Sequence, residues 1–175
     1  MISPLFRRSK RPGTISALYG AIVAQARLPA FYRDYGVPDT VEGRFELIVL
    51  HLALVLDRLA AQPELRALGQ DLFDQFCQDM DNNLREMGVG DLAVPKHMRR
   101  VGEAFYGRAQ AYRAALVSDG DQALAESLKR NIYAGTEDGR AHRLADYVCE
   151  AVRRLKALDE AGLVNGLIRF PSLSS

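Results

Sequence analysis

The residues best able to carry out chemistry or recognition lie in one run of the 175-residue chain. The run combines carboxylates, an amide and a guanidinium: Asp79, Asp81, Asn83, Arg85, Glu86 and Asp91. Such groups can form charge-assisted hydrogen bonds with a partner, and the carboxylates could also bind a divalent cation. Gly88 and Gly90 then end the predicted helix. This composition favours recognition over packing, and we predict that all six polar residues bind a partner.

A basic segment follows directly on the next predicted helix. Residues 95–113 hold five bases and one acid. Arg99, Glu103, Tyr106, Gln110 and Arg113 form one line at spacings of four and three, which is typical of a solvated charged face. With an interleaved tyrosine it could also be an electrostatic surface for RNA, an acidic protein or lipid headgroups. The residues that we predict to bind a partner here are Lys96, Arg99, Tyr106 and Arg108.

The polar ridge has two interpretations. Centring the apolar stripe of the third long helix on Phe76 places Asn83 inside that stripe, with Asp79 and Glu86 along one edge. In the first interpretation these groups form an intramolecular network with bases of the next helix, Arg99, Arg100 or Arg108. In the second they edge a groove for a partner's helix or backbone, with Met80, Met87 and Met98 as adaptable apolar neighbours.

Common catalytic sequence motifs are missing from the chain. There is no glycine-rich phosphate loop, paired CxxC, HExxH or GxSxG motif. The three histidines are too scattered for a ligand set, and His51, on a nearly wholly apolar helix, is expected to be a hydrogen-bonded core residue. Cys77 and Cys149 fall on apolar helical stripes and are expected to be small buried thiols. We therefore expect no catalytic residue, metal, cofactor or small-molecule substrate.

Length and charge predict one domain. The chain is 48% hydrophobic, and 23 Lys+Arg against 22 Asp+Glu leave a net charge of +1. The charges are nevertheless unevenly distributed along the chain. Residues 1–13 hold four bases and no acid, whereas residues 64–91 hold seven acids and two bases. The apolar run 45–56 is too short to span a bilayer. We expect a soluble protein, at most attached to a membrane surface.

Helical periodicity dominates the chain, and no useful segment alternates as a strand would. The fold predicted is all-α, a single-domain bundle of about six helices. A helix capped by Thr14 comes first, and one capped by Asp39 or Thr40 follows. From 45 to 59 this second long helix is apolar nearly all round, which places it at the centre. We predict a basic N-terminal tail at 1–13, a helical domain at 14–162 and a C-terminal tail at 163–175.

Several blocks of the chain resemble the ubiquinol-cytochrome c chaperones, assembly factors for cytochrome b of respiratory complex III. The most specific is the Asp79 to Asp91 block. The others are 18–27, Phe31-Tyr32, Val37-Pro38-Asp39-Thr40, Gly43-Arg44-Phe45-Glu46, Ile48-Val49-Leu50-His51, Lys96 and Phe105-Tyr106-Gly107-Arg108.

The resemblance implies a non-enzymatic helical chaperone that binds newly made cytochrome b and promotes assembly of ubiquinol-cytochrome c reductase. It also implies a small partner protein and the ribosomal exit as contacts in mitochondrial members. The chain shows no mitochondrial targeting segment, so we expect a bacterial member, in the cytoplasm or peripheral on the inner face of the cytoplasmic membrane.

Two alternatives stay open. One is a helical RNA- or ribosome-binding protein that uses the N-terminal basic cluster and the basic helix, with steep salt dependence. The other is a metal-carboxylate enzyme built on Asp79, Asp81, Glu86 and Asp91, which predicts stoichiometric metal in the purified protein.

Overall fold

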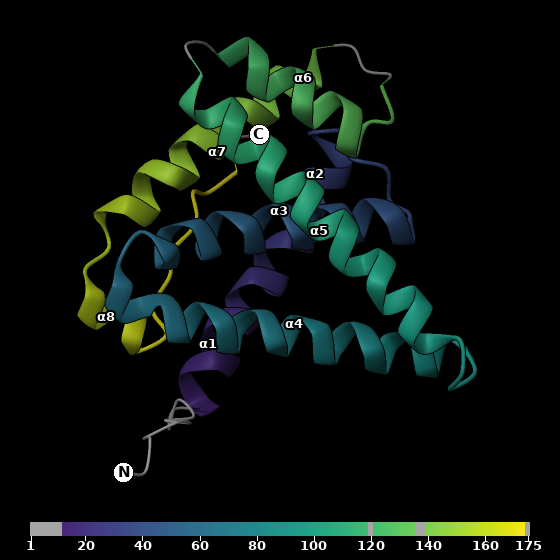
Figure 1. Ribbon diagram of the computed structural model, residues 1–175. Coiled ribbons are helices and arrows are strands. Elements are labelled where there is room, and N and C mark those ends of the chain that lie inside the picture. The colour runs from purple at the N-terminus through teal and green to yellow at the C-terminus, as the bar shows by residue number, and fades with distance from the viewer. Residues whose placement is uncertain (1–11, 119–120, 136–138, 174–175) are drawn as a thin grey trace, which may run out of the picture.

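The computed structural model describes residues 12–118, 121–135 and 139–173 (Figure 1). Within these ranges it has eight α-helices, one 3-10 turn and no strand, which confirms the all-α prediction. Six helices have 12 or more residues, as expected, and α2 and α8 have five each. The elements are α1 (Pro12–Ala26), α2 (Pro29–Arg33), α3 (Val41–Ala60), η1 (Pro63–Leu65), α4 (Arg66–Glu86), α5 (Val94–Val117), α6 (Asp121–Ile132), α7 (Arg140–Ala157) and α8 (Glu160–Val164).

Helix α3 is the centre of the fold. It lies among the other long helices (Figure 1) and contacts α1, α4, α5, α6 and α7. Every residue from Glu46 to Val55 is buried. A helix that is apolar on all sides must be enclosed to remove that surface from water, so the prediction of a central apolar helix is confirmed.

Local signals explain how the helices begin. The Thr40 side chain accepts a hydrogen bond from the Gly43 backbone N–H at 3.1 Å, so Thr40 is the cap of α3. A Cβ atom on Gly43 would lie 2.0 Å from the Pro38 carbonyl oxygen, so the chain needs glycine here. Thr14 was wrongly expected to cap α1, which already begins at Pro12. Its hydroxyl instead donates to the Val164 carbonyl at 2.8 Å.

The segment predicted as a C-terminal tail contributes to the core. Leu163 is completely buried, and Phe170 packs edge-on against His51 with ring centroids 5.0 Å apart. The Gln25 amide donates to the Pro171 carbonyl at 3.2 Å. An aperiodic segment can still pack as a strap, so core packing extends beyond residue 162. The N-terminal basic cluster, up to residue 11, lies outside the described residues.

His51 is a hydrogen-bonded core histidine, as expected. Its Nδ1 lies 2.7 Å from the Leu47 carbonyl, which can only accept, so Nδ1 carries the proton. Nε2 then accepts from the Tyr147 hydroxyl at 2.8 Å, and that hydroxyl accepts from the Gln25 amide at 3.0 Å. Burial lowers the pKa of His51 to about 4, and the bond to Leu47 opposes this only partly.

The two thiols depart from expectation. Cys77 is half-buried, and burial raises its pKa, but Cys149 is exposed. Cys149 directly follows Val148 on α7, and a one-residue step rotates a side chain by about 100° away from the buried face. In the described part of the chain, no helix combines the length and apolar content needed to cross a bilayer.

Candidate partner-binding site

Asp79 has a structural contact within the bundle. Its carboxylate accepts a 2.7 Å hydrogen bond from the hydroxyl of Tyr19, a buried residue of α1. Burial raises the pKa of Tyr19, and the bond to Asp79 raises it further. The intramolecular interpretation therefore holds for Asp79, but its partner is a tyrosine of α1 and not a base of α5.

Arg85 joins two other acids of the ridge at the end of α4. It contacts Asp81 at 2.7 Å, one turn earlier, and also forms an ion pair with Asp91 in the following loop. Arg85 and Asp91 are largely exposed and Asp81 is partly exposed, so each pair contributes little to stability. Across the described residues, no three His, Cys, Asp or Glu side chains converge as a metal site would require. This arrangement counts against the metal-carboxylate alternative.

Asn83 and Glu86 are exposed, so the expectation that Asn83 lies inside the buried stripe was wrong. The buried residues of α4 end at Phe76. Beyond it the helix continues for almost three more turns without a buried residue: Cys77 and Met80 are only partly buried against the core, and Leu84 is half-buried. The periodicity predicted correctly which face of α4 is apolar. It did not predict the residue at which the neighbouring helices stop covering that face.

Arg108 forms a bidentate ion pair with Glu46 of α3. Its Nε lies 2.6 Å and its Nη2 2.5 Å from the two carboxylate oxygens. Only 9% of the Glu46 side chain and 27% of the Arg108 side chain are exposed. The pair raises the pKa of Arg108, chiefly through the hydrogen bonds to Glu46. Arg108 therefore ties α5 to the central helix.

An open groove lies between α3, α4 and α5 and encloses about 500 Å³ of space open to water. Phe73 and Phe105 pack with ring centroids 5.0 Å apart, and Tyr106, which is 63% exposed, lies 5.6 Å from Phe73. Small residues and polar side chains complete the lining: Ala53, Ala60, Gly69, Ala109, Arg66, Gln70, Gln110 and Arg113, with Leu56. Such a groove can accept an apolar segment close to the backbone while meeting polar groups at its edge.

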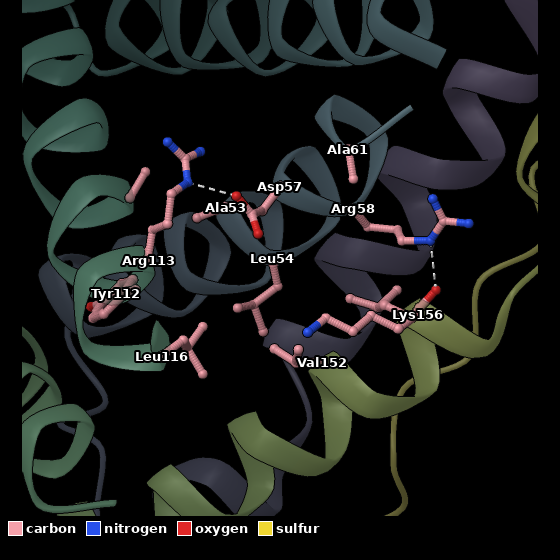
Figure 2. Close-up of a pocket in the computed structure, with 12 residues that line it drawn as sticks. Ala53, Leu54, Asp57, Arg58, Ala61, Tyr112, Arg113, Leu116, Val152 and Lys156 are labelled. Carbon is pink, nitrogen blue, oxygen red and sulfur yellow. Dashed lines mark hydrogen bonds and ion pairs between the residues drawn. The ribbon is translucent and has the colours of Figure 1, made fainter. Parts of the chain in front are cut away.

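A second, smaller pocket lies beside the groove, between α3, α5 and α7 (Figure 2). The two hollows share three lining residues, Ala53, Ala109 and Arg113. Arg113 of α5 forms an ion pair with Asp57 of α3 at 2.6 Å. Opposite, Arg58 donates to the carbonyls of Leu155 at 3.0 Å and Leu158 at 2.7 Å, so it covers the C-terminal end of α7.

The predicted residues do not form one site. Asp79 and Arg108 contact the bundle, and only Tyr106 lines the groove. The rest occupy the distal part of the α4–α5 hairpin, with Lys96 and Arg99 exposed on α5: Asp81, Asn83, Arg85, Glu86, Asp91, Lys96 and Arg99. The groove itself was missed. Its only sequence signal was the small residues Gly69 and Ala109, placed near Phe73 and Phe105 along their helices.

The all-helical fold carries an open groove with an aromatic wall, the kind of surface on which an apolar segment of another protein can lie. A family model described as Ubiquinol-cytochrome C chaperone matches residues 33–170. The chain belongs to this family. It is also similar to the crystal structure of the Cbp3 homolog from Brucella abortus, with 40% identity and a TM-score of 0.83 over 91% of this chain and 89% of that one.

Curated relatives carry the name ubiquinol-cytochrome c reductase complex assembly factor 1. The Xenopus laevis protein is 25% identical over 84% of this chain, and the Mus musculus protein is 26% identical over 89%. The Drosophila melanogaster protein is 25% identical over 83%. The chain spans 74% of the frog protein, 54% of the mouse protein and 59% of the fly protein.

Proposed function

We propose that this protein is a non-enzymatic chaperone for assembly of ubiquinol-cytochrome c reductase and that its client is newly made cytochrome b. The observation that carries the proposal is the family match over residues 33–170. The relatives named as assembly factors of the reductase complex support it. We place it in the cytoplasm or on the inner face of the cytoplasmic membrane. A small partner protein and the ribosome remain further predicted contacts.

The groove suggests how a client is held reversibly. Transmembrane helices of an unassembled membrane protein expose apolar surface, which the aromatic wall of Phe73, Phe105 and Tyr106 can cover. Gly69 and Ala109 carry little side chain and allow close approach of a client backbone. Arg113 and Gln110 offer hydrogen-bond donors to a connecting loop. Because the groove is open to solvent, it covers only part of a client and can release it.

A site-specific crosslinking experiment tests the proposal. A photoreactive residue replaces Gln110 at the groove edge, and a control replaces Ala123, which is exposed on α6. After illumination in native membranes, mass spectrometry identifies the products. Cytochrome b adducts at position 110 and not at 123 are expected. Their absence at 110, with the protein folded and membranes actively making cytochrome b, would overturn the proposal.

RNA or ribosome binding stays a prediction from the sequence. Arg108, a base of the helix that this alternative would use, is paired with Glu46, and the N-terminal basic cluster lies outside the described residues. We therefore do not advance it as a second function.

A further inference from the structure

The most exposed large apolar side chain of the described chain lies at the tip of the α4–α5 hairpin. Leu92 is 99% exposed and Met87 is 69% exposed. Figure 1 shows α4 and α5 meeting in a loop at one edge of the molecule. Two large apolar side chains are thus exposed to water at a protruding corner, and covering them with an apolar partner would be favourable.

This exposure is built into an ordered turn. Gly88 has a φ of +83°, and the backbone N–H of Val89 donates to the Leu84 carbonyl at 3.0 Å, which closes the end of α4. The N–H of Ala93 donates to the Gly90 carbonyl at 2.8 Å, and Arg85 is paired with Asp91. Val94, two residues after Leu92, is buried and occupies the inward position. Leu92 therefore points outward because its neighbours fix the turn.

The charges beside the tip select among possible occupants. Lys96, Arg99 and Arg100 are exposed on the first turns of α5, and residues 92–100 contain no acid. Among the described residues, no ion pair involves these three bases. Of the nearby acids, Asp81 and Asp91 are paired with Arg85, and Glu86 and Glu103 are exposed without an ion pair to a described base.

We propose that the α4–α5 tip docks on anionic lipid surfaces, with Leu92 and Met87 entering the headgroup region and Lys96, Arg99 and Arg100 contacting lipid phosphates. Two exposed apolar side chains beside three unpaired bases fit the two layers of such a surface, an apolar interior beneath a negatively charged headgroup layer. The three bases outnumber Glu86, the one acid of residues 86–100 without an ion pair to a described base. Basic residues near an anionic membrane each add about 1 kcal/mol to binding, so loss of three lowers partitioning by roughly a hundredfold.

The chain contains no tryptophan, so a single inserted tryptophan reports its own surroundings. Leu92→Trp in the full chain should show a blue-shifted emission when vesicles with 30% phosphatidylglycerol in phosphatidylcholine are added, and no shift with phosphatidylcholine alone. The matched control is Val117→Trp, because Val117 is 81% exposed at the opposite end of α5. It should not shift.

A sedimentation assay with the same vesicles tests the charges. In the Leu92→Trp background, K96Q/R99Q/R100Q should abolish the blue shift and weaken sedimentation at least tenfold. The control R27Q/R130Q/R169Q removes the same charge from exposed positions outside both hollows and should retain the shift. An unshifted Leu92→Trp with anionic vesicles overturns the proposal, as does an equal loss in both triple variants. A shift produced by RNA or a protein partner but not by vesicles also overturns it.

Discussion

Protonation of His51 should make stability depend on pH in a calculable way. The side chain is fully buried, its pKa is lowered from 6.5 to about 4, and both ring nitrogens are hydrogen-bonded. Between these two pKa values the unfolded chain binds the proton that the folded chain rejects. The contribution of His51 to the free energy of unfolding therefore has its full value above about pH 7 and decreases as the pH drops towards 4. The separation between a pKa of 6.5 in the unfolded chain and about 4 in the folded chain corresponds to about 2 kcal/mol lost at pH 5 and about 3 kcal/mol well below pH 4.

The assay is urea denaturation followed by circular dichroism at pH 8, 6.5 and 5, on the wild type, His51→Gln and His142→Gln. His51→Gln should lose about 2 kcal/mol less than the wild type between pH 8 and pH 5, whatever its starting stability. His142→Gln changes an exposed histidine of α7 and should keep the wild-type slope. The ring signals of His51 in the wild-type NMR spectrum should stay those of a neutral imidazole at pH 5. Equal slopes for all three proteins, or protonation of His51 near pH 6.5, would refute the reasoning.

Three further predictions concern the helix contacts and the groove. Arg108→Met should lower the free energy of unfolding by about 3–5 kcal/mol, because Glu46 is left buried and unpaired. Adding Glu46→Leu should recover much of this in urea titrations, and an unrelieved loss would contradict a paired charge. Tyr106→Ala should reduce client crosslinks at the groove several-fold at a cost of about 1 kcal/mol or less, and unchanged crosslinks would exclude the aromatic wall. Tyr19→Phe should cost about 1 kcal/mol by removing the hydrogen bond to Asp79, which thermal melts can measure, and no loss would make that bond energetically neutral.

The helices could be predicted because each carries its own periodicity and end signals. The nearly wholly apolar α3 had to be enclosed, and its Thr40 cap was readable from residue type. The course of residues 163–173 could not be predicted, because a strap such as the one carrying Phe170 needs a few well-placed contacts and no repeat. The exposure of Cys149 shows the same limit at the scale of one residue.

The polar sites were harder to predict, because charge pairing depends on which helices become neighbours. Glu46 and Arg108 form an ion pair although they are 62 residues apart in the sequence. No sequence pattern indicates that these two residues are partners. Asn83 was misplaced since a helical wheel gives the direction of a side chain but not the length over which neighbours cover it. Both errors arise from tertiary arrangement and not from local propensity.

The ridge that suggested recognition in the sequence divides where α4 leaves the core. On the core side, Asp79 is bonded to a buried tyrosine, so its replacement tests folding as much as binding. On the far side Asp81 and Arg85 lie in exposed pairs of little energetic weight, and Arg99 is exposed. Charge reversal there should leave helical content unchanged. Any loss of client or lipid binding in those variants is therefore evidence of direct contact, whereas the same loss at Asp79 is not.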